Sequence, residues 1–217
     1  MEIKVKICAT KNSCQAQNII ESKADIIGLL VGQKHTSDDF ITKEEAKEIV
    51  KFVDNRCDTS LVTHLLDSKT IIELTNYIGN NIIQLHSNIE ETEVEIIRRA
   101  LPLVKLVRLI HVDVNGQIIT NYKKMKNADF YLLDSFNLAT GQVGGTGLTY
   151  DWVQVKGIVK KLDKPTFIAG GLNPNNVKEA IDIIKPYGVD VNSGCKNELG
   201  QKDNKKVLEF VKNAKNI

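Results

Sequence analysis

The sequence predicts an α/β fold in which eight parallel strands close into a single (β/α)8 barrel over residues 1–217. Short apolar, β-favouring runs alternate with amphipathic stretches, and the runs are continuous, as is typical of strands covered on both faces. Two of the last runs also end in glycine, since residues 165–169 lead into Gly170-Gly171 and residues 188–192 lead into Ser193-Gly194. Such strand ends present backbone N–H groups to an anion, and their place near the C-terminus indicates the phosphate site of a barrel.

The predicted strands recur at the spacing of a βαβ repeat. Eight units in 217 residues give about 27 residues per unit, close to the ~30 of a βαβ unit. We expect strands near residues 3–8, 26–31, 60–65, 81–86, 104–110, 129–134, 165–169 and 188–192. Helices are expected between them, as in residues 43–50, which are apolar on one face only.

Three helix starts carry capping signals. Thr42 with Glu45 three residues later forms a capping box. Asn173 is a capping residue placed before a helix-tolerant proline. Ser68 is the expected cap of a helix that runs to about Tyr77.

A doubly wound parallel sheet is the main alternative to the barrel. Its usual marker is GxGxxG directly after the first strand. Residues 8–11 are instead Cys-Ala-Thr-Lys, so the barrel is favoured.

Composition argues against several classes of partner. With 29 basic and 27 acidic residues the net charge is +2, which is too balanced to indicate binding to nucleic acid or a membrane. No apolar run approaches the ~20 residues of a membrane span, and no signal-peptide core follows Met1. We therefore expect a cytoplasmic protein that acts on a small molecule.

The four cysteines show no spacing typical of a zinc site. In a reducing compartment they are expected to be thiols. Cys195, just past the last predicted strand, would neighbour Cys8 in a closed barrel, where a disulfide is geometrically possible.

In a barrel of this kind the chemistry takes place at the C-terminal ends of the strands. The candidate residues at those ends are Cys8, Gly32 to His35, His64, Gln84, His86, Arg108, Asp134, Gly170, Gly171, Ser193 and Gly194.

Several segments resemble the phosphoribosylanthranilate isomerase family of tryptophan biosynthesis. They are Val5-Lys6-Ile7-Cys8, Ala24-Asp25-Ile26-Ile27-Gly28, Ile83-Gln84-Leu85-His86, Leu132-Leu133-Asp134-Ser135, Gly144-Gly145-Thr146-Gly147, Tyr150-Asp151-Trp152, the run from Ala169 to Val177, the run from Gly188 to Gly194, and Lys202-Asp203. The resemblance covers nearly the whole chain and is most specific in its C-terminal half. It implies a barrel enzyme that catalyses an Amadori rearrangement without a cofactor. We expect the chain to be a monomer or a homodimer.

The resemblance also implies residue roles. Cys8 would be the general base and Asp134 the general acid, each proton transfer being typically worth ~10²–10⁴-fold in rate. The substrate phosphate would be held by Gly170, Gly171, Ser193 and Gly194, with Gly145 and Thr146 near it. Weaker substrate-binding candidates are Lys34, His35, His64, Gln84, His86 and Arg108.

The sequence departs from the family pattern at the substrate mouth. Ala9 stands where the family usually has glycine, and Lys196 where an acid is common. The family's Ser-x-Arg after strand two, whose arginine holds the anthranilate carboxylate, is missing from residues 32–40. Lys34 or His35 would hold a carboxylate more loosely. Two alternatives therefore stay open, namely an isomerase for another phosphorylated sugar or amino-sugar, and a non-catalytic barrel that binds a phosphorylated metabolite.

Overall fold

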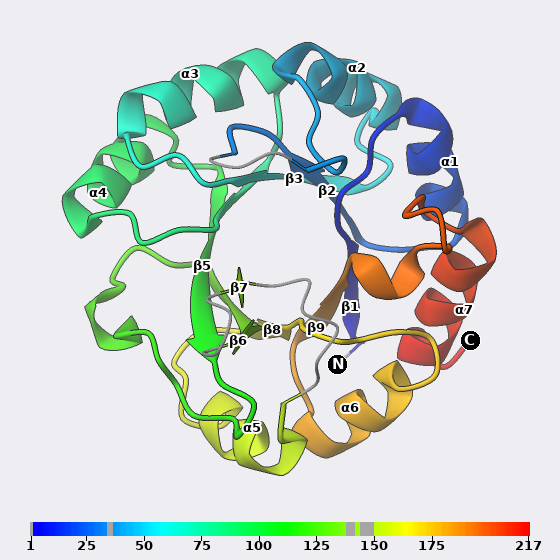
Figure 1. The fold of residues 1–217 in the computed structure, drawn as a ribbon. Coiled ribbons are helices and arrows are strands. Elements are labelled where there is room, and N and C mark those ends of the chain that lie inside the picture. Colours follow the sequence, from blue (N-terminus) through cyan, green and yellow to red (C-terminus); the bar gives the residue numbers. More distant parts are fainter. Residues whose placement is uncertain (1, 34–36, 138–141, 144–149) are drawn as a thin grey trace.

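The computed structural model describes residues 2–33, 37–137, 142–143 and 150–217, and these form a closed parallel barrel (Figure 1). Its strands are β1 (Lys4–Ile7), β2 (Ile26–Leu30), β3 (Asp58–Thr63), β4 (Ile82–Leu85), β5 (Lys105–Val112), β6 (Phe130–Asn137), β8 (Thr166–Ile168) and β9 (Gly188–Val191). The order is β5-β4-β3-β2-β1-β9-β8-β6, and pairing of β5 with β6 closes the ring. The predicted barrel is confirmed, and the doubly wound sheet is excluded because that sheet would keep two open edges.

Helices surround the strands as an outer ring (Figure 1). Within the described residues they are α1 (Ser13–Glu21), α2 (Lys43–Val53), α3 (Ser68–Ile78), α4 (Glu91–Ala100), α5 (Trp152–Val159), α6 (Val177–Ile184) and α7 (Asn204–Lys215). The red helix α7 packs beside the blue helix α1, so the two ends of the chain meet on one side of the barrel.

The connection from β5 to β6 departs from the expected alternation. Residues 113–129 contain only the 3-10 turn η1 (Tyr122–Lys124) instead of an α-helix. The carboxylate of Asp113 accepts the N–H groups of Asn115 and Gln117 at 3.0 and 2.7 Å, and Gly116 has φ +74°. This turn reverses the chain and therefore prevents a helix there.

The short strand β7 (Gln142–Val143) was also not expected from the sequence. It pairs antiparallel with the end of β6, which explains why β6 runs beyond the predicted residues 129–134.

The capping predictions have mixed outcomes. The capping box is confirmed, because the Glu45 N–H donates to Thr42 Oγ1 at 3.1 Å and the Thr42 N–H donates back to Glu45 Oε2 at 2.7 Å. The Ser68 prediction is wrong by one residue. The cap of α3 is Asp67, whose carboxylate accepts the N–H of Thr70 at 2.8 Å, and Ser68 is the first helical residue.

The Asn173 prediction is also wrong. Helix α6 begins at Val177 and its cap is Asn176. Asn173 Oδ1 instead accepts the N–H of Asn175 at 2.9 Å. The side chain therefore holds a turn that precedes the helix.

Side-chain alternation divides each strand between the barrel interior and the helices. In β1, Val5 and Ile7 are fully buried in the core beneath the helices, whereas Lys6 faces the interior, where it meets Asp190 of β9. One cluster in the interior consists of Ile26, Ile82, Val107, Leu109, Leu132, Phe167 and Ala169, with Phe130 and Tyr187 packed against them. Of these, Leu132 and Ala169 also line an open pocket at the C-terminal end of the barrel.

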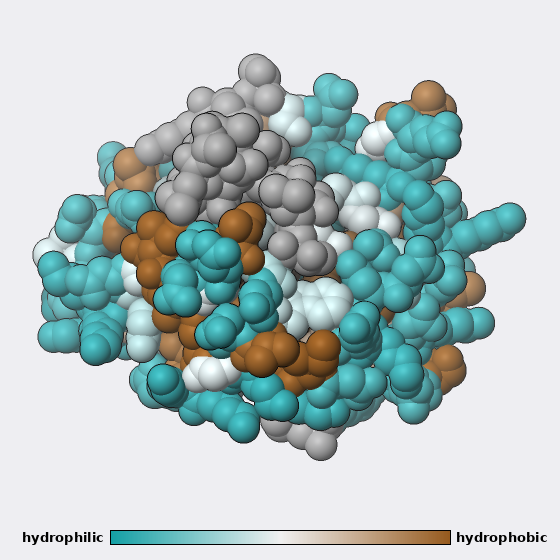
Figure 2. All heavy atoms as spheres, turned by 60° about the horizontal axis from the view of Figure 1, so that its bottom comes forward, coloured by the Kyte–Doolittle hydropathy of each residue, from teal (hydrophilic) through white to brown (hydrophobic). Residues whose placement is uncertain are grey.

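The outer surface is mainly hydrophilic. On the face seen in Figure 2, apolar residues form small groups among hydrophilic ones. None of the helices in the described part of the chain is long and apolar enough to cross a membrane.

Candidate active site

A pocket of about 730 Å³ lies at the C-terminal end of the barrel. All eight barrel strands, or the residues directly after them, contribute to its lining. Of the predicted site residues it brings together Cys8, His64, Gln84, His86, Asp134, Gly170, Gly171 and Ser193. Lys34, His35, Gly145 and Thr146 lie outside the described residues.

The Arg108 prediction is wrong. The guanidinium of this β5 residue donates to Glu91 Oε2 of α4 at 2.8 Å and is not part of the pocket lining as described. Its strand neighbours Val107 and Leu109 belong to the interior cluster, so Arg108 faces the opposite side, towards the helices. It joins α4 to the barrel.

Cys8 directly follows β1 and lines the pocket. Its N–H donates to Val191 O at 2.8 Å, which places the residue against β9. Gly28 of β2 leaves the space that the thiol occupies, since a Cβ there would lie 3.0 Å from Cys8 Sγ and 3.2 Å from Lys6 Nζ. Burial raises the pKa of the Cys8 thiol and Asp190 adds to the rise, while the nearby Lys6 and Lys202 ammonium groups lower it in part.

Ala9 has φ +60°, in the left-handed region, and is buried. This backbone conformation explains why glycine suits the position after Cys8. Alanine has the smallest side chain that can replace it.

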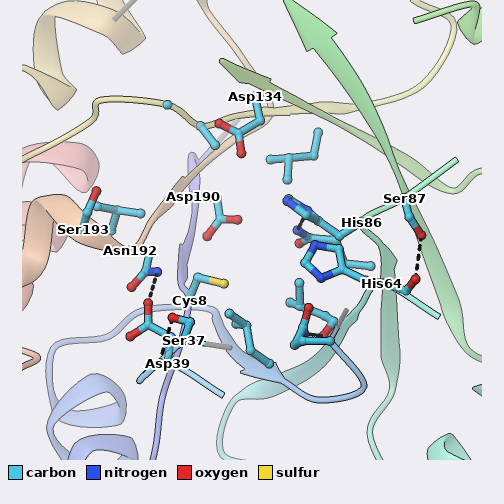
Figure 3. A pocket seen from close by; sticks show the side chains of 18 of the residues that line it. Cys8, Ser37, Asp39, His64, His86, Ser87, Asp134, Asp190, Asn192 and Ser193 are labelled. Carbon is cyan, nitrogen blue, oxygen red and sulfur yellow. Dashed lines mark hydrogen bonds between the residues drawn. The ribbon is translucent and has the colours of Figure 1, made fainter. Parts of the chain in front are cut away.

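Asp134 faces the pocket from β6, opposite Cys8 (Figure 3). The N–H of Ser135 donates to its Oδ1 at 2.8 Å. Burial, followed by the negative charge of Asp190, raises the pKa of Asp134 to about 7. A carboxyl group with this pKa is protonated in about half of the molecules at neutral pH, so Asp134 is able to donate a proton there.

Two charged residues that the sequence reasoning missed lie close to this acid and this base. Lys6 and Asp190 are register partners in β1 and β9, and Lys6 Nζ donates to Asp190 Oδ2 at 2.7 Å with both side chains buried. Figure 3 shows the Asp190 carboxylate between Asp134 and Cys8. A usable signal was present, because a charged residue inside a strand covered on both faces needs a buried partner.

Histidines form the wall opposite Cys8 (Figure 3). The rings of His64 and His86 lie 5.2 Å apart, and Gln84 Nε2 is 3.1 Å from His86 Nδ1. His111 lies one residue beyond the predicted strand 104–110, but it belongs to β5 and also lines the pocket, because that strand continues to Val112.

The glycine-rich ends of β8 and β9 have the geometry of an anion cradle. Gly170 and Gly171 have φ +88° and +64°, and a Cβ on Gly170 would lie 2.6 Å from Ser135 Oγ. A Cβ on Gly194 would lie 1.9 Å from the carbonyl oxygen of Leu172. Only glycine fits these two positions.

The short 3-10 turn η2 (Ser193–Cys195) follows β9. Its first internal hydrogen bond runs from the Cys195 N–H to Asn192 O at 3.2 Å. The first N–H groups of a helical turn are not used by the turn's own hydrogen bonds. In η2 these are the N–H groups of Ser193 and Gly194.

The segment after β2 places an acid at the pocket. Asp39 lines it, and Lys196 Nζ lies 2.6 and 2.7 Å from the two carboxylate oxygens. Asn192 Nδ2 donates to Asp39 Oδ2 at 2.9 Å. Burial alone would raise the pKa of Asp39, but these partners hold it below its usual value.

All four cysteines are free thiols, so Cys8 and Cys195 are not joined. Among the described residues no group of histidine, cysteine and acidic side chains has the arrangement of a metal site.

Comparisons with known proteins agree with this geometry. A family profile described as N-(5'-phosphoribosyl)anthranilate (PRA) isomerase matches residues 5–213. The N-(5'-phosphoribosyl)anthranilate isomerase 2 of Methanosarcina mazei is 40% identical over 99% of this chain and 95% of its own length. The corresponding isomerase of Aquifex aeolicus is 35% identical over 98% of both chains.

Solved structures agree as well. The phosphoribosyl anthranilate isomerase of Thermotoga maritima superposes with a TM-score of 0.83 at 28% identity, over 99% of this chain and all of its own. Another such isomerase, in complex with reduced 1-(o-carboxyphenylamino)-1-deoxyribulose 5-phosphate, has a TM-score of 0.77 at 27% identity, over 99% of this chain and all of its own. With its barrel, its facing cysteine and aspartate, and these full-length matches, the chain belongs to the phosphoribosylanthranilate isomerase family.

Proposed function

We propose that this protein converts N-(5-phosphoribosyl)anthranilate to 1-(2-carboxyphenylamino)-1-deoxyribulose 5-phosphate, a step of tryptophan biosynthesis. One observation carries the proposal beyond family membership. Cys8 and Asp134 face each other across one pocket, and the pKa of Asp134 is raised to about 7. The pocket thus combines a thiol, which is a base in its thiolate form, with an acid that keeps part of its proton near neutrality, as an Amadori rearrangement requires.

The two residues divide the proton transfers. Asp134 gives its proton to the ring oxygen of the ribose, while the amine nitrogen forms a double bond to carbon 1 and the bond from carbon 1 to the ring oxygen breaks. Cys8, as thiolate, then takes the proton from carbon 2, and the electron pair moves through the carbon 1 to carbon 2 bond to neutralise the iminium nitrogen. Protonation at carbon 1 and loss of the enol proton give the ketone. No redox cofactor or metal enters this balance.

The phosphate end of the substrate is assigned to the β8 and β9 cradle. Gly170 and Gly171 allow close approach of the backbone, and Ser193 and Gly194 supply N–H groups at the start of η2. Anions are stabilised by such donors. Gly145 and Thr146 are proposed to lie near the phosphate on the basis of the sequence motif alone.

Complementation of a tryptophan auxotroph lacking this isomerase tests the proposal. Growth is expected with the wild-type chain and is expected to be lost with Cys8→Ala and with Asp134→Asn. Cys14→Ser is the matched control because Cys14 is exposed and remote from the pocket lining. Failure of a folded wild-type protein to support growth, together with no turnover in vitro, would contradict the proposal.

A second candidate function follows from Asp39. The pocket presents a carboxylate, paired with Lys196, in the segment where the family resemblance leads us to expect an arginine, and such a pair attracts an aglycone carboxylate far less than an arginine would. A phosphoribosyl amine without that carboxylate would undergo the same rearrangement. Steady-state rates with the aniline and anthranilate derivatives of phosphoribose distinguish the two functions, and a higher kcat/KM for the aniline derivative would favour the second.

The setting of the enzyme is part of the same proposal. We place it in the cytoplasm and expect it to work as a monomer or homodimer. A relative from Thermotoga maritima is described as dimeric, which makes sedimentation of the purified chain the direct measurement.

A further inference from the structure

The segment that follows η2 folds back on itself as a small hairpin. Lys196 and Lys202 are antiparallel bridge partners in it, and the Asn197 N–H closes the turn between them by donating to Gln201 O at 2.8 Å. Lys202 belongs to one of the sequence segments that resemble the family, but the proton transfers described above give it no part. The hairpin carries its side chain back to the end of β1, where Cys8 lies.

The ammonium group of Lys202 lies among three oxygen atoms from the ends of β1 and β9. It donates to Cys8 O at 2.7 Å, to Asn192 Oδ1 at 3.1 Å and to Asn192 O at 3.3 Å. An ammonium group has three N–H donors and a neutral amine has two, so three acceptors fit the charged form. Lys202 is also not part of the pocket lining as described. Its donors therefore hold protein groups in place and are not offered to a ligand.

Asn192 extends these contacts to the segment after β2. Its Nδ2 donates to Asp39 Oδ2 at 2.9 Å, beside Cys8 (Figure 3). Asp39 is in turn paired with Lys196 of the hairpin. Lys202 thus joins the end of β1 directly to the end of β9 and, through Asn192, to the segment after β2. The backbone of Cys8 is fixed from the side that faces the hairpin.

The charged groups around Cys8 differ in whether an opposite charge cancels them. Four of them form two ion pairs, namely Lys6 with Asp190 and Asp39 with Lys196. Lys202 donates only to uncharged oxygen atoms and forms no ion pair within the part of the chain that the structure describes. Its positive charge is therefore not cancelled by a paired acid, and it acts on the thiol of Cys8.

We propose that Lys202 is a positioning residue for the base: it holds the Cys8 backbone at the edge of the pocket and supplies the positive charge that favours the Cys8 thiolate. The inference deepens the proposed function and rests on its assignment of Cys8 as the base. An opposite charge nearby stabilises the ionised form of a group, so the thiolate is expected to become scarcer when this ammonium group is removed. Lys202 acts through Cys8 and does not touch the substrate.

The pKa directions of both groups agree with this arrangement. Burial raises the pKa of the Cys8 thiol most, while Lys6 and Lys202 lower it and Asp190 raises it. Burial is also the largest effect on Lys202 and lowers its pKa, whereas a negative charge on Cys8 raises it. The thiolate and the ammonium group therefore stabilise each other. The other titratable groups that face Lys202 are Cys195, Lys196 and Asp39.

Alkylation of Cys8 by iodoacetamide tests the charge directly, because the thiolate is the form that reacts. The rate is followed by peptide mass spectrometry as a function of pH in a Cys14→Ser background, since Cys14 is exposed. We expect the profile of Lys202→Met to lie about 1 pH unit above that of the wild type, so that the alkylation rate at pH 8 and kcat/KM both fall about 10-fold. Calorimetric binding of ribulose 5-phosphate is expected to be unchanged, which separates an effect on the base from an effect on the ligand site.

Two further variants keep the test decisive. If Lys202→Met does not fold, Lys202→Gln takes its place, because it keeps N–H donors for the Cys8 carbonyl group and removes only the charge, and the same slower alkylation is expected. Lys206→Met is the matched control. Lys206 Nζ also donates to a carbonyl group of the hairpin, that of Lys196, at 2.7 Å, but this lysine is exposed. Its alkylation profile and kcat/KM are expected to match the wild type.

An alkylation profile of Cys8 that stays at the wild-type position in a folded Lys202 variant would overturn the inference, since Lys202 would then hold the hairpin alone. Equal displacement of the profile in Lys206→Met would overturn it as well. The profile belongs to the free protein and needs no substrate. A displaced profile in a chain that does not turn over the anthranilate substrate would therefore support the effect of Lys202 on Cys8 and count against the proposed function alone.

Discussion

At the scale of single residues, Asp134 is expected to lower the free energy of unfolding at neutral and higher pH, where its buried carboxyl group loses its proton. Its pKa is about 7 in the folded chain and about 3.9 in an unfolded one. Between these values the folded state binds more protons, so its contribution to stability falls as the pH rises through that window. Asp134→Asn keeps the shape and removes the charge. We expect the variant to be more stable than wild type by roughly 2–4 kcal/mol at pH 8.

Urea unfolding at pH 4 and pH 8 measures this difference. At pH 4 the two proteins should have nearly equal stability, because Asp134 is then protonated in the folded wild type. A stability difference that is the same at both pH values would contradict the raised pKa.

Lys196 is the residue that neutralises the acid at the aglycone end. Lys196→Ala leaves the Asp39 carboxylate in the pocket without its cation, so an anionic substrate is repelled. We expect KM for the anthranilate derivative to rise about 10-fold with a smaller change in kcat. KM for the aniline derivative should change less.

Lys185→Ala is the control for that change, since Lys185 forms an exposed ion pair with Asp182 on α6. Equal effects of Lys196→Ala on the KM of both derivatives would show that Lys196 supports the fold of the loop and not the charge of the pocket.

At the scale of elements, the turns after β8 and β9 depend on glycine for a steric reason. Gly194→Ala would drive a Cβ into the Leu172 carbonyl, and we expect a loss of about 3 kcal/mol in the free energy of unfolding with weaker binding of ribulose 5-phosphate. Gly157 is the matched control. It lies in helix α5 with nothing within 4 Å of an added Cβ, so Gly157→Ala should raise stability by about 0.5–1 kcal/mol. Thermal unfolding compares the two, and equal effects would refute the steric argument.

The strands and their order could be predicted because their signal is local. Each one is a continuous apolar run between turn residues, and only the ends are displaced, as in β3, which covers 58–63 instead of the expected 60–65. The segment after β5 was missed because its Asn115-Gly116 turn, a typical hairpin signal, interrupts the alternation of strands and helices. A periodic pattern predicts repeated units well and predicts a missing helix poorly.

The candidate site was predictable only where a residue type carries its own chemical signal. Cys8 and the glycine-rich strand ends stand out in the sequence. Lys6 and Asp190 each stand out only as a charged residue inside a buried strand, and their pairing depends on the register between the first and the last barrel strand, which no local pattern specifies. The prediction for Arg108 was wrong for a related reason. Its neighbours Val107 and Leu109 pack into the barrel interior, so Arg108 faces the helices.

At the scale of the whole molecule, the contacts that stabilise the barrel and the groups that line its pocket lie at opposite ends of its axis. Two aspartates, each paired with a lysine of β1, illustrate this. At the N-terminal end, Asp25 receives Lys4 Nζ at 2.8 Å and Lys215 Nζ at 2.8 Å, which ties β1 and the C-terminal helix α7 to the start of β2. At the other end, Asp190 receives Lys6 but leaves one oxygen to the pocket. Both carboxylate oxygens of Asp25 are bonded to protein groups, whereas Oδ1 of Asp190 has no hydrogen-bond partner among the described residues.

The two aspartates should therefore differ in their effect on activity when each is changed to asparagine. Asp25→Asn removes the charge that holds α7 against β1, and we expect a loss of about 3 kcal/mol in stability at pH 7 with kcat/KM unchanged. Lys215 and Lys4 hold the pKa of Asp25 below its usual value against the effect of burial. This carboxylate therefore contributes stability above its unfolded pKa and loses it as the pH falls through the folded value, so the penalty should shrink towards pH 3. Asp190→Asn should also lower stability by about 3 kcal/mol, because it leaves the buried Lys6 ammonium group unpaired, but it should in addition reduce kcat/KM, because Asp190 lines the pocket. Unfolding curves and steady-state kinetics on both variants decide the matter, and a loss of activity in Asp25→Asn at temperatures where it is fully folded would show that the two ends of the barrel are coupled.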